Sequence, residues 1–360
     1  MILNIVEPTL NDYTGHCYSL VEAIAQAAPT GQVQIWAGVE SGKIWSAKGE
    51  VKPYFFRPLR KIQSFFLYRH LLKQPGKLLL STAGTTDVLL LDWAAHGKIP
   101  ENKVYLYVHW LGTKASKSQK LAKLAQNQPN LEILCSTVTT TAFFRNLGFR
   151  ARMVAYPRAQ DDPKVQPSQA FQHLLFAGAA RMDKGFDRIA DLVEDLARMK
   201  EPWPMRIQTS ATHQARHGAE ILFQIERLRR SAYSGLTLIG TTLAPPDYQA
   251  LFSGGISIQP YAKADFADRV SGVTLDALTA GCPVVVTADT WLGRVVLKHN
   301  AGVATSDLSP NGLRMAVNVI LRDYAGYSRR AANAALALRQ EHSATAMMSA
   351  IFQDERSSGV

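Results

Sequence analysis

The sequence predicts an α/β protein built of two doubly wound, Rossmann-like domains that face a cleft. Short apolar runs alternate with helical patterns along the chain, and the runs are apolar on both faces, as in parallel strands covered by helices on both sides. One polar stretch with three prolines, YPRAQDDPKVQPSQAF, interrupts this alternation near the middle. We therefore expect an N-terminal domain over 1–157, a second domain over 158–340, and a C-terminal helix and tail over 341–360 that packs back on the first domain.

The strand-like runs divide into two series. The first series covers residues 2–6, 33–37, 87–93, 104–108 and 131–135. The run 2–6 is followed by a polar turn and the helical pattern 18–28, and most of the others are followed by helix-like segments. Those of the second series cover residues 173–178, 205–210, 236–240, 256–261, 283–288 and 302–306. From about residue 308 the pattern is helical. Two α/β series joined by one linker predict two doubly wound sheets.

Length and composition fit this organisation. A chain of 360 residues suffices for two domains, and 47% hydrophobic residues is an ordinary globular content. The apolar runs are shorter than the roughly 20 residues that span a bilayer, and the start, MILNIVEP, resembles a strand rather than a signal peptide. Three widely spaced cysteines form no disulfide framework or zinc pattern. We expect a cytoplasmic protein.

The net charge of +11 is concentrated in the first domain. Residues 1–157 hold 18 Lys and Arg against 9 Asp and Glu, a balance of +9. An anionic partner would explain this charge, although a merely basic soluble surface is an alternative. Residues 54–77 interleave basic with aromatic and aliphatic side chains, which suits an anionic membrane face on the inner side of the membrane, or a packed surface helix. Nucleic acid is an unlikely partner, because no binding motif accompanies the charge.

The strongest local pattern is ISIQPYAKADFADRVSGVTLDALTAGCPVVV, which predicts a strand, a loop, a short helix and a second strand. Ser271 and Gly272 stand where the helix begins, so backbone N–H groups there can receive a diphosphate. Asp276, on the helix, can accept both ribose hydroxyls, while Asp268 precedes it in the loop. The alternative is that Asp276 only caps or solvates the helix.

A second pattern, LLFAGAARMDKGFDRIADL, predicts a strand, a turn and a helix. The turn holds Gly178, Arg181 and Lys184, and two cations there suit the developing charge of a diphosphate leaving group. Basic residues in turns are more often simply solvated. In the first domain, Gly15 and His16 follow the first strand, and His109 follows the strand 104–108, at the strand ends where such sheets bind ligands. A structural role is the alternative for each histidine.

Together the two patterns of the second domain resemble the retaining GT-B glycosyltransferases, family 4 above all. Those enzymes carry two glutamates that flank seven residues before an Ala-x-x-x-Gly-x-Pro-Val-Val run, and this chain has Asp268, Asp276 and DALTAGCPVVV. Their turn with Lys-Gly corresponds to Lys184-Gly185, while Arg181 stands two residues after the usual basic position, which is Ala179 here. The order of elements is similar along essentially the whole chain.

The resemblance implies a glycosyltransferase that takes a sugar from a nucleotide diphosphate sugar. Asp276 would hold the ribose, Asp268 would face the donor sugar, and the loop with Thr241 and Thr242 would pack on the base. The turn with Gly15 would lie near the phosphates, and His109 near the donor sugar. The acceptor would be a glycan or lipid-linked molecule bound by the first domain.

Retention of configuration is expected, although His16 beside Asp12 would suit a general base in an inverting reaction. The family's retaining enzymes need no metal, and no metal or cofactor is expected here. Two rival functions remain: another enzyme on this scaffold, such as a sugar-nucleotide epimerase or a phosphorylase, and a non-catalytic protein that binds membranes, nucleotides or nucleic acid.

Overall fold

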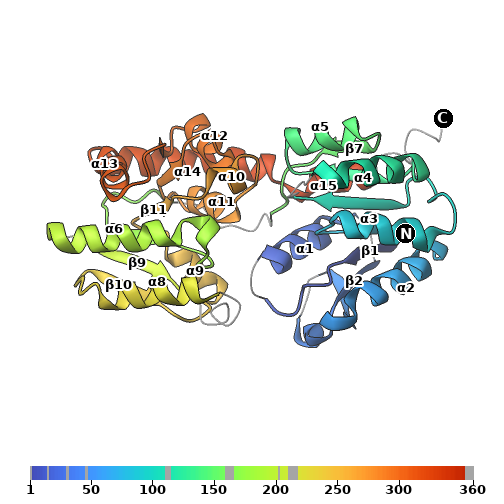
Figure 1. Cartoon of the computed structure of the whole chain (residues 1–360). Coiled ribbons are helices and arrows are strands. Elements are labelled where there is room, and N and C mark those ends of the chain that lie inside the picture. Colours follow the sequence, from blue (N-terminus) through green and yellow to red (C-terminus); the bar gives the residue numbers. More distant parts are fainter. Residues whose placement is uncertain are drawn as a thin grey trace. The chain divides into compact units, whose positions relative to one another are not determined.

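The structure is a computed structural model that describes residues 2–13, 16–29, 32–44, 48–109, 115–158, 166–201, 203–209 and 218–352. The chain forms two compact units (Figure 1). Unit 1 consists of Met1–Asp161 together with Glu341–Val360, and unit 2 consists of Asp162–Gln340. Among the described residues, none of the helices combines the length and the apolar character that crossing a bilayer requires.

Unit 1 contains a parallel sheet with the strand order β3-β2-β1-β4-β5-β6-β7. Its strands are β1 (Ile2–Val6), β2 (Gln32–Gly38), β3 (Gly49–Phe55), β4 (Lys77–Leu80), β5 (Val104–Val108), β6 (Glu132–Cys135) and β7 (Arg150–Met153). Its helices are α1 (His16–Ala27), α2 (Arg60–Lys73), α3 (Thr85–Ala95), α4 (Ala115–Asn127), α5 (Val138–Asn146) and α15 (Ala344–Phe352).

Unit 2 contains a second parallel sheet, with the order β10-β9-β8-β11-β12-β13. Its strands are β8 (His173–Phe176), β9 (Met205–Gln208), β10 (Leu236–Ile239), β11 (Gly255–Gln259), β12 (Val284–Thr287) and β13 (Gly302–Thr305). Its helices are α6 (Phe186–Met199), α8 (Ala219–Arg230), α9 (Pro245–Ala250), α10 (Lys263–Phe266), α11 (Gly272–Thr279), α12 (Trp291–Lys298), α13 (Pro310–Leu321) and α14 (Tyr324–Glu341).

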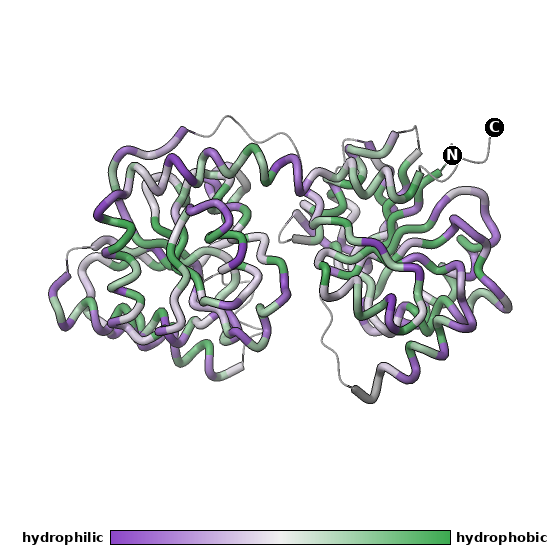
Figure 2. Tube along the Cα trace, turned by 90° about the horizontal axis from the view of Figure 1, so that it is seen from above, coloured by the Kyte–Doolittle hydropathy of each residue, from purple (hydrophilic) through white to green (hydrophobic). Residues whose placement is uncertain are grey.

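The central strands are covered on both faces. Every residue of β4, β5, β6, β8, β11 and β12 is buried. Because successive side chains of a strand point to opposite faces, complete burial requires helices on both sides of the sheet. Figure 2 shows the hydrophobic parts of the trace running through the middle of each unit. The prediction of two doubly wound, Rossmann-like sheets is confirmed.

The strand predicted at residues 87–93 is wrong, because these residues form most of helix α3. The Asp87 carboxylate accepts a hydrogen bond of 2.8 Å from the Gly84 amide and so caps the helix start. Val88, Leu91 and Ala94 are buried at helical spacing, whereas Trp93 is 58% exposed. A short apolar run does not by itself distinguish a buried helix from a buried strand. The strand of this region is β4, ten residues earlier.

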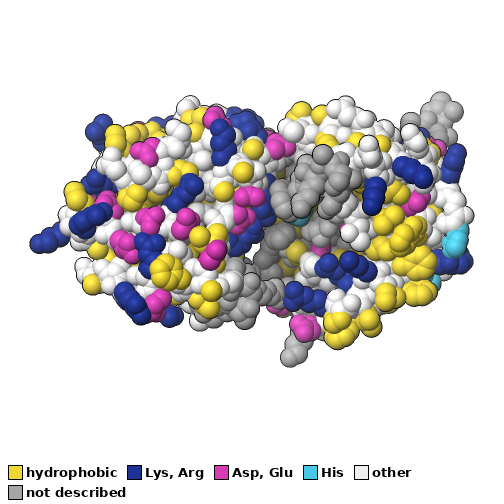
Figure 3. All heavy atoms as spheres, viewed as in Figure 1, with side chains coloured by type: hydrophobic (Ala, Val, Ile, Leu, Met, Phe, Trp, Pro, Cys, Tyr) yellow, Lys and Arg dark blue, Asp and Glu magenta, His cyan; other side chains and the backbone are white. Residues whose placement is uncertain are grey.

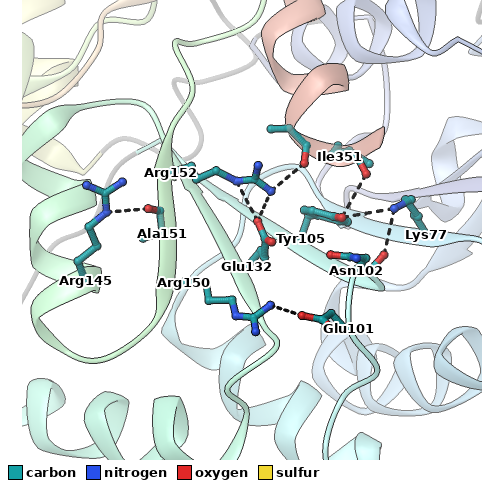
Figure 4. A network of polar contacts seen from close by, with 11 residues as sticks. Lys77, Glu101, Asn102, Tyr105, Glu132, Arg145, Arg150, Ala151, Arg152 and Ile351 are labelled. Atoms are coloured by element: carbon teal, nitrogen blue, oxygen red, sulfur yellow. Dashed lines mark hydrogen bonds and ion pairs between the residues drawn. The ribbon is translucent and has the colours of Figure 1, made fainter. Parts of the chain in front are cut away.

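The C-terminal helix α15 belongs to unit 1, where hydrogen bonds attach its last turn (Figure 4). The Tyr105 hydroxyl donates to the Ile351 carbonyl oxygen at 3.1 Å, and the Arg152 guanidinium donates to the Ala350 carbonyl at 2.9 Å. Arg152 is itself held by Glu132, at 3.0 Å from Nε. These bonds satisfy carbonyls that have no partner within the helix.

Candidate active site

The topology of unit 2 singles out one place for a ligand. The strand order reverses between β8 and β11, because β9 and β10 lie on one side of β8 while β12 and β13 lie beyond β11. At such a switch point the connections leave in opposite directions and open a crevice at the carboxyl ends of the strands. Residues that directly follow Phe176 and Gln259 therefore line this crevice.

Gly178 brings the turn after β8 against helix α11. Its φ is +90°, a left-handed conformation that favours glycine. A Cβ atom at this position would lie 3.0 Å from Val273 Cγ2 and 3.1 Å from the Lys184 ammonium. The Gly178 amide donates to Gln208 Oε1 at 2.7 Å, which fixes the turn to the end of β9. Glycine is required here for both conformation and space.

Lys184 points its ammonium toward Tyr261, with Nζ 5.4 Å from the centre of the ring. Burial lowers the pKa of Lys184 to about 8, and repulsion from Arg181 adds to the effect. A desolvated ammonium gains more from an incoming anion than a solvated one does, because little hydration remains to be removed. Lys184 lies in the turn between β8 and α6, and its role toward a diphosphate stays a prediction.

Arg181 and Arg269 share the carboxylate of Asp183. Arg181 makes a two-pronged ion pair, in which Nε donates to Asp183 Oδ1 at 2.8 Å and the terminal nitrogen donates to Oδ2. Arg269 donates to the same Oδ2 at 3.3 Å. With Lys184, three cationic groups gather around Asp183, and such a cluster can receive an anionic ligand.

Arg269 and Asp183 were missed by the sequence reasoning. Arg269 stands two residues before the helix start predicted at Ser271, and this closeness to the predicted diphosphate site could have identified it. Asp183 lies between the two predicted cations.

Helix α11 presents its N-terminus at the same crevice. Ser271 is the N-cap, and its hydroxyl accepts from the Thr274 amide at 3.3 Å. Thr274 Oγ1 donates to Gln259 Oε1 at 2.6 Å, which fastens the helix start to the end of β11. Gly272 is exposed, and no atom of the described residues lies within 4 Å of the position a Cβ would occupy. A first helical turn with this access can approach a phosphate closely.

Asp276 is held by an aromatic hydroxyl. Tyr248, in α9, donates to Asp276 Oδ2 at 3.0 Å. Asp276 is the fifth residue of α11, and Ser271 has the cap position, so Asp276 does not cap the helix. The carboxylate is half-buried, and the hydrogen bond from Tyr248 orients it, so it can form directed hydrogen bonds with a ligand.

Three predicted residues of unit 2 remain. Asp268 is in the loop before α11, and Arg294 donates to it at 3.2 Å. Thr241 and Thr242 follow β10 and are exposed. Among the described residues, no group of His, Cys, Asp and Glu has an arrangement that holds a metal ion.

In unit 1, His109 directly follows β5 and is half-buried. Its ring centre lies 6.2 Å from that of Tyr156, and its carbonyl oxygen accepts from the Ser136 hydroxyl at 3.0 Å. His16 begins helix α1, but its side chain is outside the described part of the structure, and Gly15 also lies outside the described residues.

A buried carboxylate at the end of β1 was also missed by the sequence reasoning. Glu7 is fully buried, and its Oε2 accepts from Ser81 at 2.8 Å and from Thr82 at 2.5 Å. Its Oε1 accepts from the Thr9 hydroxyl at 2.5 Å. These bonds join the turns after β1 and β4, at the point where the strand order of unit 1 reverses.

Comparison with known proteins identifies the fold. No protein-family model and no curated protein matches the sequence. Sucrose-phosphate synthase from Thermosynechococcus elongatus is similar with a TM-score of 0.71 and 14% identity, over 99% of this chain and 100% of that one. HepE from Anabaena, in complex with UDP and glucose, is similar with a TM-score of 0.71 and 13% identity, over 99% and 100%.

A third similar structure is WaaG, a glycosyltransferase involved in lipopolysaccharide biosynthesis. Its TM-score is 0.65, with 13% identity over 97% of this chain and 99% of that one. At these identities the likeness establishes the fold. The chain has the GT-B fold, as the resemblance of its two motifs implied.

Proposed function

We propose that this protein is a glycosyltransferase that moves a sugar from a nucleotide diphosphate sugar to a glycan or lipid-linked acceptor. The cation cluster at the switch point of unit 2 carries the proposal. Lys184 lies against Gly178, which also faces Val273 of α11, and Arg181 and Arg269 are close by. This combination fits a diphosphate better than it fits a neutral ligand.

In this proposal the donor binds mainly in unit 2. The first turn of α11 and Lys184 receive the diphosphate, Asp276 accepts the ribose hydroxyls, Asp268 faces the donor sugar, and the loop with Thr241 and Thr242 packs on the base. As the bond from the anomeric carbon to the phosphate oxygen breaks, negative charge grows on the leaving diphosphate. Cations that are already in position stabilise that charge more than they stabilise the bound donor.

UDP-sugars are the first donors to test. HepE was solved with UDP and glucose, and separately with UDP-glucose. The match at low identity supports the choice of a UDP-sugar as a starting point and leaves the sugar open.

Retention of configuration is part of the proposal. The leaving phosphate oxygen accepts the proton of the acceptor hydroxyl while that hydroxyl oxygen bonds to the anomeric carbon on the same face. His109 then positions the donor sugar. Proton NMR of the anomeric signal tests this, together with His109→Ala and His16→Ala. An inverted product, with His16→Ala inactive and His109→Ala active, would overturn retention and assign His16 as the general base.

A peripheral site on the inner face of the membrane completes the proposal. Phe56, Leu59, Ile62 and Phe66 are between 49% and 60% exposed at the start of α2 and along it. Figure 3 shows hydrophobic side chains gathered over the α2 and α3 region of unit 1, beside Lys, Arg and His side chains. An exposed apolar group with a basic border suits an anionic bilayer surface.

A panel of nucleotide sugars tested by thermal shift tests the donor-binding part of the main proposal. A glycosyltransferase is expected to be stabilised by one nucleoside diphosphate and its sugar, since a ligand that binds only the folded state raises its stability. A non-catalytic membrane-binding protein would show no such stabilisation, and that outcome would refute the proposal. An epimerase would isomerise the donor without an acceptor, which NMR of the same mixtures detects.

A further inference from the structure

A cavity of about 280 Å³ lies where helices α2 and α3 of unit 1 end. Its lining includes Arg69, Lys73, His96 and Lys98, with apolar contributions from Leu72 and Pro100. None of the described lining residues carries a carboxylate. Three cations and an imidazole around one small cavity form a concave site for an anion.

The basic side chains are contributed by two helices that pack together. Arg69 donates a hydrogen bond to Nε2 of His96, and this contact links α2 to the end of α3. His96 is the residue after α3, in a left-handed conformation with φ of 48°. The Arg69 guanidinium is therefore held at the cavity, although its remaining N–H groups can still reach a ligand.

The cavity continues an exposed stripe of α2. Ile62, Phe66, Arg69 and Lys73 are separated by 4, 3 and 4 residues, a spacing that places them along one side of the helix. The stripe changes from apolar to basic along its length, because Ile62 is 59% and Phe66 is 60% exposed while Arg69 and Lys73 line the cavity. On α3, Trp93 adds an exposed aromatic ring three residues before His96.

Helix ends alone do not explain this arrangement. A cation near a helix C-terminus interacts favourably with the helix dipole, which accounts for Lys73 in the last turn of α2. The same effect does not explain why Ile62, Phe66 and Trp93 are exposed, since contact of apolar side chains with water is unfavourable. In the described residues no carboxylate forms an ion pair with Lys73 or Lys98. An anionic bilayer accounts for both features, since it offers phosphates to the cations and acyl chains to the rings.

We propose that this cavity binds the phosphate group of an anionic phospholipid, with Phe66 and Trp93 entering the bilayer beside it. The inference deepens the membrane part of the proposed function. It adds His96, Lys98 and Trp93, which lie outside the 54–77 segment, to the docking surface. Basic side chains around a concavity can contact one phosphate together, whereas a flat basic face responds only to surface charge.

The test compares a double variant, Lys73→Ala with Lys98→Ala, with a control that loses two exposed charges of unit 2, Arg229→Ala with Arg322→Ala. Sedimentation with phosphatidylcholine vesicles containing phosphatidylglycerol is measured at several salt concentrations. We expect about a tenfold loss of binding for the cavity variant, because each basic residue near an anionic surface contributes measurably. The control should lose much less. Equal losses in both variants would overturn the cavity and leave general charge attraction.

Two further measurements identify the source of the phosphate. Phe66→Ser should lower binding to anionic vesicles even at high salt, where charge attraction is screened. Inorganic phosphate and glycerol phosphate are titrated separately, and tight binding of either one without vesicle binding would overturn the lipid assignment. Nucleoside diphosphate binding, measured on the same variants, should be unchanged. If the original protein binds anionic vesicles but neither it nor any variant binds a nucleoside diphosphate, the proposed function is refuted and the lipid assignment stands.

Discussion

The two sheets have the same kind of switch point but different chemistry there. In unit 2 the turns after β8 and β11 present Lys184, Arg181 and Arg269 around the open start of α11. In unit 1 the turns after β1 and β4 enclose the carboxylate of Glu7, which takes its hydrogen bonds from Ser81, Thr82 and Thr9. The switch point of unit 2 therefore carries clustered cations. The carboxylate at the switch point of unit 1 accepts hydrogen bonds from neighbouring hydroxyls of the same unit.

This difference is consistent with the two different roles proposed for the units. A ligand with a diphosphate gains from clustered cations and from helix amides, and unit 2 has both at its switch point. A buried carboxylate bound by hydroxyls does not attract anions, so this part of unit 1 is unlike the diphosphate site proposed in unit 2. Fold alone does not assign either role, because doubly wound sheets serve many ligands. The side chains that follow the strands make the distinction.

The largest expected effect is that of Lys184→Ala. The transfer rate should fall about 100-fold, since removal of one positioned group that stabilises developing charge costs about 3 kcal/mol. Thermal stability should stay the same or rise, because a desolvated ammonium is removed. Lys263→Ala, which removes an exposed lysine paired with Asp289 in the same unit, is the control. A normal rate in Lys184→Ala would contradict the role of the cluster.

Asp276→Ala tests whether the carboxylate on α11 binds the ribose. The affinity for the nucleoside diphosphate should fall by about 2 kcal/mol, as expected for hydrogen bonds to a charged group. Tyr248→Phe keeps the carboxylate but removes the bond that orients it, so a smaller loss of about 1 kcal/mol is expected. Isothermal titration calorimetry measures both. If both variants bind like the original protein, Asp276 contributes nothing to the donor site.

Glu7→Gln tests the other side of the comparison. The free energy of unfolding should fall by about 1.5 kcal/mol, because an amide replaces a charged acceptor that the Ser81 and Thr82 hydroxyls use. Nucleotide binding in unit 2 should not change. Glu50→Gln alters an exposed carboxylate of the same unit and is the control. Loss of transfer at full stability would show that Glu7 acts on the substrate and that the two switch points are more alike.

The smallest effect is a dependence on pH. Burial lowers the pKa of Lys184 to about 8, so its charged form is lost as the pH rises through that value. Because the ammonium attracts the diphosphate, kcat/KM should decrease above pH 8, by about fivefold between pH 8 and 9 for a single group. Lys184→Ala should lack this decrease. A decrease of the same size in that variant would assign the titration to another group.

Among the candidate site residues, those predicted from the sequence are the ones whose expected role depends on local order. Lys184, Ser271 and Gly272 could be predicted because a strand, a turn and a helix start follow one another within a few residues. Arg269 was missed because its role depends on Asp183, which is 86 positions away. The orientation of Asp276 likewise depends on Tyr248, 28 positions earlier and in a different helix.

By itself, the sequence determined that this chain is an α/β protein with two sheets, because hydrophobic periodicity is a local property that each segment carries. It also determined the strands of unit 2, all six of which were predicted at or near their observed positions. Only the tertiary structure decided that residues 87–93 are a helix and that Glu7 is buried among hydroxyls. A run such as LLLD packs equally well in either form, and the neighbours that choose between them come from distant parts of the chain.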